Sequence, residues 1–416
     1  MTESSLIPAA SDRPGDDPIF ALNAEATARA AAGESIINST LGALMTDAGD
    51  LAVMGSVQAA LGRVPAAKAS AYAPIAGVTD FLDAVVQDLF GGTPLAEQAV
   101  AAGTPGGTGA CYTAIQNFLE PGQALLTSSY FWGPYRILAE HARRRLETYR
   151  MFDEEGEFDT AALRDRLVEI VRAQGRGLLF LNTPCHNPTG YSMTAEDWRA
   201  TSAALAEAAH FGPVTLLIDF AYGKFAGTAA WRDSVGELVE SGVTVLVAWT
   251  ASKGFAQYGA RVGACVAVHR DAQERSRLKN ALSFSCRATW SNCNHLGMLV
   301  IGEILKHDDL RAQSERERQA NIELLGARVE VFNRLAREAG LRFPRYEGGF
   351  FVSVFTPDAG LTCRFAQERG VYLVPLDGAV RVAICATSEA DLPRLVATLS
   401  DAVRHAEREQ ATLADA

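Results

Sequence analysis

The chain has 416 residues, and at about 150 residues per domain this length favours two or three domains with a large core. Its 38 basic and 49 acidic residues give a formal charge of −11, and such a surface repels nucleic-acid phosphates and anionic lipids unless basic groups cluster locally. With 48% hydrophobic and 21% charged residues, the composition is that of a globular protein rather than a disordered one. The most apolar runs, Val243–Trp249 and Val214–Ile218, are far shorter than the roughly 20 residues of a membrane-spanning helix. Nucleic-acid-binding, membrane-spanning and disordered proteins are therefore disfavoured.

Residues 1–16 are polar and interrupted by prolines, which predicts a loose arm or a segment that orders only on a partner. They contain neither a basic start nor a continuous apolar stretch, so we expect no signal peptide and a cytoplasmic location. The seven cysteines are scattered and form no CxxC pair, which argues against a disulfide framework. Cys286 and Cys293 lie near His295 but lack the spacing of metal ligands, so no metal site is expected.

From about residue 95 to 270, short apolar runs alternate with longer helical patterns, which is the βαβ signature of a mostly parallel sheet covered by helices. We predict strands over Ala99–Ala102, Ala124–Thr127, Gly177–Leu181, Thr215–Asp219, Thr244–Trp249 and Gly263–Val268. We predict helices over Thr108–Leu119, Phe131–Arg145, Thr160–Ala173 and Ala195–Ala209. The fold class is therefore α/β.

The pattern changes after residue 306. Residues 307–340 carry apolar positions at helical spacing in a charged background, which predicts one long or two abutting amphipathic helices that bridge domains. Beyond them, strands are predicted over Gly349–Val354, Tyr372–Val374 and Arg381–Cys385, and a closing helix over Glu389–Ala406. The plan is a large sheet domain followed by a smaller C-terminal α/β domain.

Lys253 comes just after the strand predicted over Thr244–Trp249, and Arg261 comes eight residues later. A lysine held at the edge of a sheet is suited to form an imine with a carbonyl compound, and a nearby arginine is suited to hold a phosphate. Taken alone, both residues are more often solvated surface charges, because lysine and arginine in loops usually face water.

Three further segments place suitable groups at strand ends. Gly103–Gly109 follows a strand and opens a helix, where backbone N–H groups and the helix dipole attract a phosphate. Asp219 ends a strand, where its carboxylate could pair with a protonated pyridine nitrogen, and Tyr222 follows three residues later. Asn187 could donate its amide to a phenolate oxygen, or form an ordinary Asn-Pro turn.

The motifs HNPTG, LIDFAY, SKGFAQYGARVGA and RVAICAT, in this order and spacing, resemble the aspartate and aromatic aminotransferases of pyridoxal phosphate fold type I. The resemblance covers nearly the whole chain and includes the early segments DPIFALN and YAPIAG. It implies a large domain with a seven-stranded, mostly parallel sheet, a smaller α/β domain, a homodimer with shared active sites, and pyridoxal 5′-phosphate as cofactor. It also implies three parts: an N-terminal arm with part of the small domain over 1–52, a cofactor domain over 53–318, and a C-terminal small domain over 319–416.

The resemblance also implies roles for single residues. Lys253 would bond covalently to the cofactor and later serve as the catalytic base, and a desolvated amine near cations has a pKa suited to that work. Asp219 would keep the pyridine nitrogen protonated, and Tyr222 and Asn187 would hydrogen-bond the 3′ oxygen. The other implied cofactor contacts are Trp132 over the ring, Gly107, Thr108, Thr250 and Arg261 at the phosphate, and Tyr72 from a second subunit.

For the substrate, the resemblance implies that Arg381 grips the α-carboxylate with a bidentate fork, near the backbone at Gly42 and beside Trp132 and Asn187. Arg287 would bind a distal carboxylate, so that one substrate pair is dicarboxylic, most plausibly glutamate and 2-oxoglutarate. The alternative for Arg287 is a structural arginine paired with a nearby acid.

The chain departs from the family pattern at several positions. Gly106 replaces a hydroxyl residue of the phosphate loop, and Tyr135 and Asn182 stand where the family often has histidines behind the aspartate. The residues around the entrance, Thr40-Leu41 and Leu44-Met45, differ as well. These departures leave open the substrate and the tuning of the ring nitrogen.

The sequence is compatible with three functions. The first is transamination by a ping-pong mechanism between an amino acid, aspartate, aromatic or related, and a 2-oxo acid. The second is another reaction of the same cofactor, such as that of a lyase, decarboxylase or oxidase in a specialised biosynthetic pathway. The third is a regulatory protein with an aminotransferase-like effector domain, which would need a DNA-binding module for which the chain has no spare length.

Overall fold

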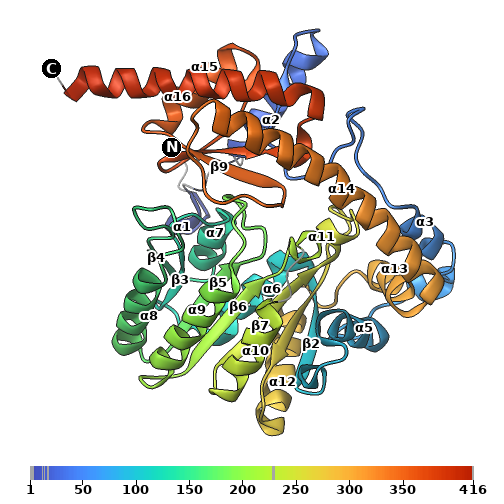
Figure 1. Ribbon diagram of the computed structural model, residues 1–416. Helices are drawn as coiled ribbons and strands as arrows, with labels where there is room; N and C mark the ends of the chain where they lie inside the picture. The colour runs from blue at the N-terminus through green and yellow to red at the C-terminus, as the bar shows by residue number, and fades with distance from the viewer. Residues whose placement is uncertain (1–3, 12, 14, 16–17, 227–229, 415–416) are drawn as a thin grey trace.

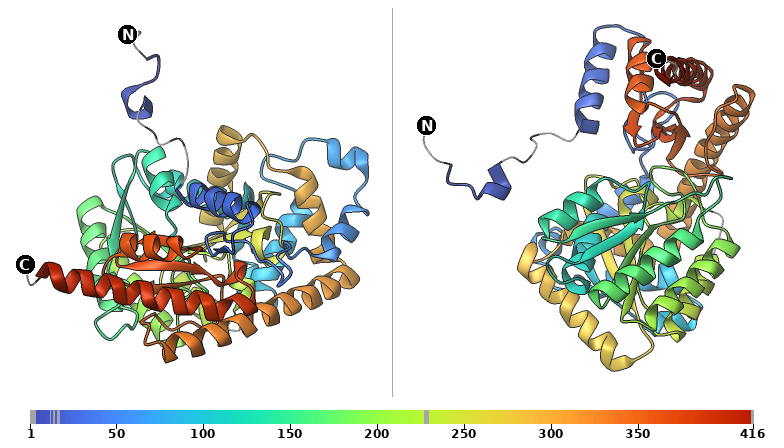
Figure 2. Two further views of the ribbon diagram at one scale, coloured as in Figure 1. Left: turned by 90° about the horizontal axis from the view of Figure 1, so that it is seen from above. Right: turned by 90° about the vertical axis from the view of Figure 1, so that its left-hand side faces the viewer.

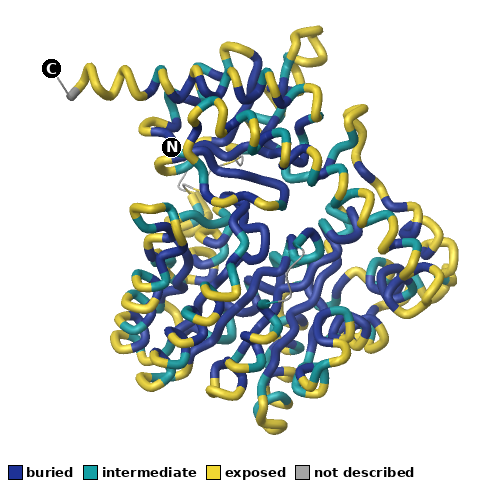
Figure 3. Tube along the Cα trace, viewed as in Figure 1, coloured by how far each residue is buried: buried dark blue, intermediate teal, exposed yellow. Residues whose placement is uncertain are grey.

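The computed structural model describes residues 4–11, 13, 15, 18–226 and 230–414. A large body built on a twisted sheet carries a smaller body along one edge, and a long helix connects the two (Figure 1). Most strands of the large sheet are buried along almost their whole length, whereas its outermost strand and the outer helix faces are more exposed (Figure 3).

The large sheet has seven strands in the order β2-β8-β7-β6-β5-β3-β4. Their bounds are β2 Ala99–Pro105, β3 Ala124–Ser128, β4 Arg145–Tyr149, β5 Gly177–Asn182, β6 Val214–Asp219, β7 Thr244–Thr250 and β8 Val262–Val268. Strand β8 runs antiparallel to both of its neighbours, and the other pairings are parallel. The predicted α/β class with a mostly parallel seven-stranded sheet is confirmed.

Helices cover both faces of this sheet, so successive strand residues enter different cores. Leu217 and Leu246 pack with one group of helices, whereas Leu216 and Val247 pack with the other. The helices around the large sheet are α3 Gly55–Leu61, α4 Ala66–Ser70, α5 Thr79–Phe90, α6 Gly106–Phe118, α7 Pro134–His141, α8 Thr160–Gln174, α9 Ala195–Ala209, α10 Ala230–Glu240, α11 Ala251–Gly254, α12 Ala272–Thr289 and α13 His295–Lys306. Burial on both faces requires the continuous apolar runs that identified these strands.

Side-chain caps fix where the helices after β4 and β5 begin. Asp159 Oδ1 accepts a hydrogen bond from the Ala162 amide at 2.8 Å at the start of α8. Thr194 and Asp197 form a reciprocal capping box at the start of α9, which satisfies two amides that the helix itself leaves unpaired. The predicted helices over 160–173 and 195–209 are confirmed to within a residue.

The smaller body combines both ends of the chain (Figure 2). Its three-stranded antiparallel sheet, in the order β11-β12-β9, consists of β9 Phe351–Phe355, β11 Val374–Leu376 and β12 Ala379–Ala383. Strand β1 (Ile37–Asn38) pairs in parallel with β10 (Val371–Tyr372), so the N-terminal segment joins this body. Its helices are α2 Pro18–Ala31, α14 Asp308–Glu338, α15 Ala359–Glu368 and α16 Leu392–Ala414.

Three predicted elements need correction. The strand predicted over Tyr372–Val374 is two strands, β10 and β11, which pair in different sheets. The helix predicted over Phe131–Arg145 spans only Pro134–His141, and Arg145 instead begins the edge strand β4. This strand lies at the rim of the sheet and is half exposed, so it has no apolar run that would reveal it. The strand predicted over Arg381–Cys385 is β12, which starts two residues earlier and ends at Ala383.

The segment over 307–340 is one helix of 31 residues, α14. The predicted boundary between residues 318 and 319 falls inside this helix and stays a prediction. Of the predicted arm over 1–16, the structure describes 4–11, 13 and 15, which include the short helix α1 (Pro8–Ser11), and the remainder lies outside the described residues. None of the described helices is both long enough and apolar enough to cross a membrane.

Candidate active site

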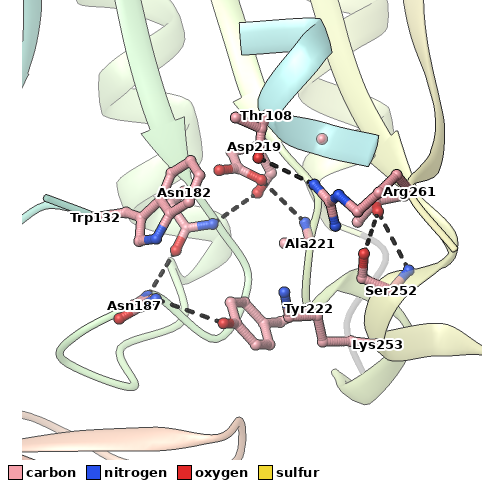
Figure 4. Close-up of a pocket in the computed structure, with 12 residues that line it drawn as sticks. Thr108, Trp132, Asn182, Asn187, Asp219, Ala221, Tyr222, Ser252, Lys253 and Arg261 are labelled. Carbon is pink, nitrogen blue, oxygen red and sulfur yellow. Dashed lines mark hydrogen bonds between the residues drawn. The ribbon is translucent and has the colours of Figure 1, made fainter. Parts of the chain in front are cut away.

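A cavity opens where the carboxyl ends of β5, β6 and β7 face the smaller body, and its side chains come from segments far apart in the sequence (Figure 4). In α/β sheets, ligands bind in the crevice at these strand ends. The lining residues are Gly107, Thr108, Trp132, Asn182, Asn187, Asp219, Ala221, Tyr222, Thr250, Ser252, Lys253 and Arg261. The structure therefore brings together the predicted phosphate, ring and lysine residues of one chain.

Asp219 is a buried carboxylate at the end of β6. Tyr135 Oη donates a hydrogen bond to its Oδ2 at 2.6 Å, and the Ala221 amide donates to its Oδ1 at 3.2 Å. Burial raises the pKa of Asp219 above its ordinary value, while the Tyr135 hydrogen bond and the Lys253 charge oppose that rise. Because burial also raises the pKa of Tyr135, the phenol is a neutral donor throughout the physiological range.

Tyr135 is itself fixed by aromatic packing. Its ring meets the rings of Trp132 and Phe180 edge to face, with centroids 5.5 and 5.2 Å apart, and its side chain is fully buried. Edge-to-face contacts hold a ring in one orientation. Tyr135 therefore couples the position of Trp132 to the orientation of the Asp219 carboxylate.

Asn182 connects two neighbouring strand ends. Its Nδ2 donates to the Asp219 carbonyl oxygen at 3.0 Å, and its Oδ1 accepts from the Asn187 amide at 2.6 Å. The Asn187 side chain in turn lies 3.5 Å from the Tyr222 hydroxyl. The amide at position 182 thus holds the loop of Asn187 against the end of β6, without adding a charge behind Asp219.

Lys253 extends from the one-turn helix α11 into the cavity (Figure 4). Its Nζ lies 5.5 Å from the centroid of the Tyr222 ring and 6.0 Å from that of Tyr258. Burial, aided by the charge of Arg261, lowers the pKa of Lys253, and Asp219 acts in the opposite direction. Among the described residues none accepts a hydrogen bond from Nζ, which leaves the amine available for a ligand.

The opposite end of the cavity is lined by hydrogen-bond donors suited to an anion. We call this group, formed by Thr108, Thr250, Ser252 and Arg261, the anion cup. Arg261 Nη2 lies 3.4 Å from both Thr108 Oγ1 and the Pro105 carbonyl oxygen, at the start of α6. Arg261 has φ of 53°, a costly conformation for a residue other than glycine, and such strain persists only where the surroundings enforce it. A Cβ at Gly106 would lie 2.7 Å from Arg261 Nη2. The glycine that departs from the family pattern is therefore the residue that makes room for this arginine.

Hydroxyl groups complete the cup. Thr250 Oγ1 lies 2.9 Å from Ser252 Oγ and accepts a hydrogen bond from the Ser252 amide at 3.2 Å. A guanidinium group, hydroxyls and free amides at a helix start form a donor set suited to a phosphate.

Arg381, on β12 of the smaller body, contacts Asn187, which is one of the residues that line the cavity. Its Nη2 donates to the Thr40 carbonyl oxygen at 2.6 Å, and its Nη1 lies 3.5 Å from Asn187 Oδ1. The guanidinium carbon stands 4.3 Å from the centroid of the Phe351 ring. A Cβ at Gly42 would lie 2.6 Å from Phe351 Cζ, so Gly42 permits the N-terminal segment to approach this ring closely.

Four predicted site residues are not among those that line the cavity: Gly42 and Arg381, described above, and Tyr72 and Arg287. Tyr72 is 91% exposed, and Arg287 is an exposed residue near the end of α12 whose Nη1 donates to Ser291 Oγ at 2.6 Å. Neither lines the cavity of its own chain. Their predicted roles, and the predicted roles of the residues that do line the cavity, stay predictions.

Sequence reasoning assigned no role to Ser252, although this residue lines the cavity beside Lys253. A hydroxyl residue directly before a strand-end lysine was the available signal. The local contacts of Tyr135 and Asn182, two positions noted only as departures, also place them directly behind Asp219 and Asn187.

The residues present fit pyridoxal phosphate on chemical grounds. The cavity joins a cup of phosphate donors, a buried carboxylate suited to a pyridinium nitrogen, and a desolvated amine suited to an aldehyde. The carboxylate and the amine are poorly matched to a purely apolar ligand, because buried charges need partners.

Comparison with known proteins agrees with this geometry. Residues 37–399 match the model of the family "Aminotransferase class I and II". The chain is 31% identical over 325 residues to an aspartate aminotransferase of Escherichia coli, covering 75% of this chain and 79% of that one. It is 28% identical over 390 residues to an aromatic-amino-acid aminotransferase of Paracoccus denitrificans, covering 91% and 95% respectively. The solved structure of an aminotransferase from Anaerococcus prevotii superimposes with a TM-score of 0.90 at 30% identity, covering 96% of this chain and 100% of that one.

The chain therefore belongs to the class I and II aminotransferases. It is an enzyme that transfers amino groups between amino acids and 2-oxo acids with pyridoxal phosphate as its cofactor. The comparisons give no support to the alternative reactions of this cofactor.

The contact between Tyr135 and Asp219 gives a first testable prediction. Tyr135→Phe removes the donor that lowers the pKa of Asp219, so this pKa rises, and the carboxylate becomes protonated at a higher pH. We expect the acid limb of the kcat/KM profile, and of the bound cofactor's visible absorption, to move to higher pH. Tyr112→Phe, on α6 with its hydroxyl bound to Gln116, is the control. Unmoved acid limbs in Tyr135→Phe would rule out this role of the phenol.

Proposed function

We propose that the enzyme exchanges amino groups between glutamate with 2-oxoglutarate and a second amino acid, aspartate, aromatic or related, by a ping-pong mechanism in the cytoplasm. The observation that supports this most directly is the convergence of Lys253, Asp219 and Arg261 in one cavity, with Arg381 at its edge. The names of the aspartate and aromatic relatives support the substrate class.

In this proposal each residue of the cavity has a defined task. The cofactor, when bound, supplies an aldehyde that takes up the amino group and a ring that withdraws electrons from the substrate's α-carbon. Arg261, Thr108, Thr250, Ser252 and the amides at Gly107 hold its phosphate. Trp132 covers the ring, while Asn187 and Tyr222 donate to the ring oxygen.

Asp219 and Lys253 carry the chemistry of the protein itself. Asp219, anionic and buried, keeps a proton on the pyridine nitrogen, because a buried carboxylate is stabilised by an adjacent positive charge. Lys253 Nζ, with its pKa lowered by burial, takes the proton from the substrate's α-carbon, as a base with a pKa near the working pH does most efficiently. Arg381 holds the α-carboxylate close to the Gly42 backbone, which orients the bond to that proton.

Arg287 is proposed to bind the distal carboxylate of a dicarboxylic substrate in the active site of a second copy of the chain. Its exposure, and that of Tyr72, in the single chain supports this, because a two-fold dimer presents each residue to the neighbouring site reciprocally. Pairing of Arg287 with an acid of its own chain is the alternative, and the hydrogen bond to Ser291 does not require it.

The substrate proposal is tested with Arg287→Ala. Loss of the arginine leaves a distal carboxylate without its partner, which costs roughly 2–5 kcal/mol in a buried pair. We therefore expect kcat/KM to fall strongly for glutamate and aspartate and far less for phenylalanine. Arg277→Ala, ten residues earlier on α12 and exposed, serves as the control. Equal losses for all three substrates would defeat the distal-carboxylate role.

The shared active site is tested by mixing two variants that each turn over a dicarboxylic substrate poorly. In a hybrid dimer of Lys253→Ala and Arg287→Ala subunits, one of the two sites contains both native residues. We expect partial recovery of activity with a dicarboxylic substrate after subunit exchange, up to roughly a quarter of the wild-type level from statistical mixing. Absence of recovery in subunits shown to exchange would contradict shared sites.

A further inference from the structure

A second cavity, of about 290 Å³, lies beside the turns that follow Tyr222 and Lys253, because Lys224 and Phe255 line it. Its walls come from α5, from the turn after Tyr222, from Phe255, and from α13 and α14. Its polar lining consists of Gln87, Asp88, Lys224, Arg311, Ser314, Glu315 and Arg318. None of these residues lines the active-site cavity.

The charge of Asp88, the less exposed of the two acidic residues that line this cavity, is already neutralised. Asp88 forms an ion pair with Lys224, and its Oδ2 accepts a hydrogen bond from Trp249 Nε1 at 2.9 Å. The remaining charged groups are the half-buried cation Arg318 and two exposed residues of opposite charge, Arg311 and Glu315. The cavity therefore presents an excess of positive charge.

Arg318 is the cation in this wall that most lacks a partner. Its Nη1 reaches the Gly254 carbonyl oxygen only at 3.5 Å, and its guanidinium carbon lies 5.8 Å from the centroid of the Phe255 ring. Within the described ranges it forms no ion pair. Burial lowers its pKa, and the charges of Asp88 and Glu315 oppose that shift. A desolvated guanidinium of this kind gains strongly from a planar oxyanion that matches its fork.

Ser314, one helical turn before Arg318 on α14, independently indicates a ligand in this cavity. Its side chain is 1% exposed and lines the cavity, yet in the described part of the chain its Oγ has no hydrogen-bond partner. A buried hydroxyl without a partner is unfavourable, and such groups in folded proteins usually have a ligand or a water.

We propose that this cavity binds a small metabolite through its carboxylate or phosphate group, with Arg318 and Ser314 as the principal contacts and Arg311 in support. Its volume lies at the lower end of the range for small-molecule sites, so the ligand has the size of a simple acid or a phosphorylated small molecule. Arg311 Nε donates to the Leu305 carbonyl oxygen at 3.0 Å, and its Nη2 donates to the same oxygen, so its Nη1 is the donor that faces the anion in this proposal.

The position of the cavity makes it a regulatory site, and this part of the inference rests on the proposed function of Lys253. Gly254, which Arg318 contacts, follows Lys253 directly. A Cβ at Gly254 would lie 3.1 Å from Lys224 Cγ, so Lys224 packs tightly against the same turn. An anion that draws Arg318 from the Gly254 carbonyl alters the support of the α11 turn, and hence the placement of the Lys253 amine.

The experiment measures binding of inorganic phosphate and, separately, of acetate to the holoenzyme by calorimetry, in the absence of amino acids. Variants are Arg318→Gln, Arg318→Lys and Ser314→Ala, with Arg316→Gln as the matched control because Arg316 is exposed on the same helix and does not line the cavity. We expect saturable binding by wild type and Arg316→Gln, at least about tenfold weaker binding by Arg318→Gln, and intermediate losses for Arg318→Lys and Ser314→Ala. Whichever of phosphate and acetate binds more tightly identifies the anionic group of the ligand.

Each other outcome overturns the proposal. Absence of saturable binding of either anion excludes the site, and binding that persists unchanged in Arg318→Gln assigns the anion to the active site. An equal loss of anion affinity in Arg316→Gln would show that the effect comes from the overall charge of the protein and not from this cavity. Thermal denaturation shows whether Arg318→Gln is folded. If it is not, the anion affinities of Arg318→Lys and Ser314→Ala decide the test. Because binding is measured without turnover, these results are independent of the role of Lys253, which the cofactor's absorption during each titration reports separately.

Discussion

Reduction of the holoenzyme with borohydride should attach the cofactor irreversibly to Lys253, and Lys253→Ala should abolish both this labelling and nearly all turnover. The amine lies in the cavity with its pKa lowered by burial, so that it is uncharged, and therefore reactive, at a lower pH than a free lysine. A positioned general base contributes roughly 10²–10⁴ in rate, and loss of the covalent attachment adds to this. The measurements are peptide mapping of the reduced protein and single-turnover kinetics.

Lys279→Ala is a suitable control, because Lys279 is exposed on α12 and does not line the cavity. It should keep the yellow colour and the activity of the wild type. Labelling of a different lysine in the reduced wild-type protein would sink the assignment of Lys253.

Asp219→Ala should retain some bound cofactor yet lose most turnover. The carboxylate is buried and receives hydrogen bonds from Tyr135 and the Ala221 amide, so its charge is aimed at one position in the cavity. A fixed charge of this kind stabilises the transition state more than the resting state, and removal of one such group costs roughly 10²–10³ in rate. Asp219→Asn, which keeps the shape and removes the charge, should lose a similar factor.

Cofactor affinity and single-turnover rate are the two quantities to compare. If both variants lose affinity and rate by equal factors, Asp219 is an anchor for the cofactor and has no special role in the reaction.

The sequence predicted the centre of the site because that centre depends on where strands end. The ends of β6 and β7 lie side by side in the sheet, so Asp219 and Lys253 had to meet once a parallel sheet was inferred. The anion cup follows from the sheet in the same way. The start of α6 comes directly after β2, and Arg261 comes directly before β8. Because β2 pairs with β8, these two segments lie close together.

The remaining features depend on how helices and side chains approach each other in space, which periodicity does not reveal. The hydrogen bond from Tyr135 to Asp219 joins residues 84 positions apart, and it exists because α7 lays a tyrosine between Trp132 and Phe180. The orientation of Asn182, with its oxygen toward the Asn187 amide, is likewise set by neighbouring strands. Strand β4 escaped prediction because an edge strand shares its polar composition with a helix surface.

The continuity of α14 has a consequence for protein engineering. Leu310, near its start, packs in the core of the large sheet, whereas Leu325, Val329 and Phe332 pack in the core of the smaller body. A chimera with a related enzyme should therefore be joined near the exposed residues 319–320, where the helix passes from one core to the other. A joint placed after the helix would set three of its apolar side chains against a foreign core, with a cavity or a clash as the result. The best crossover point for recombining substrate preferences thus lies within a helix rather than in a loop.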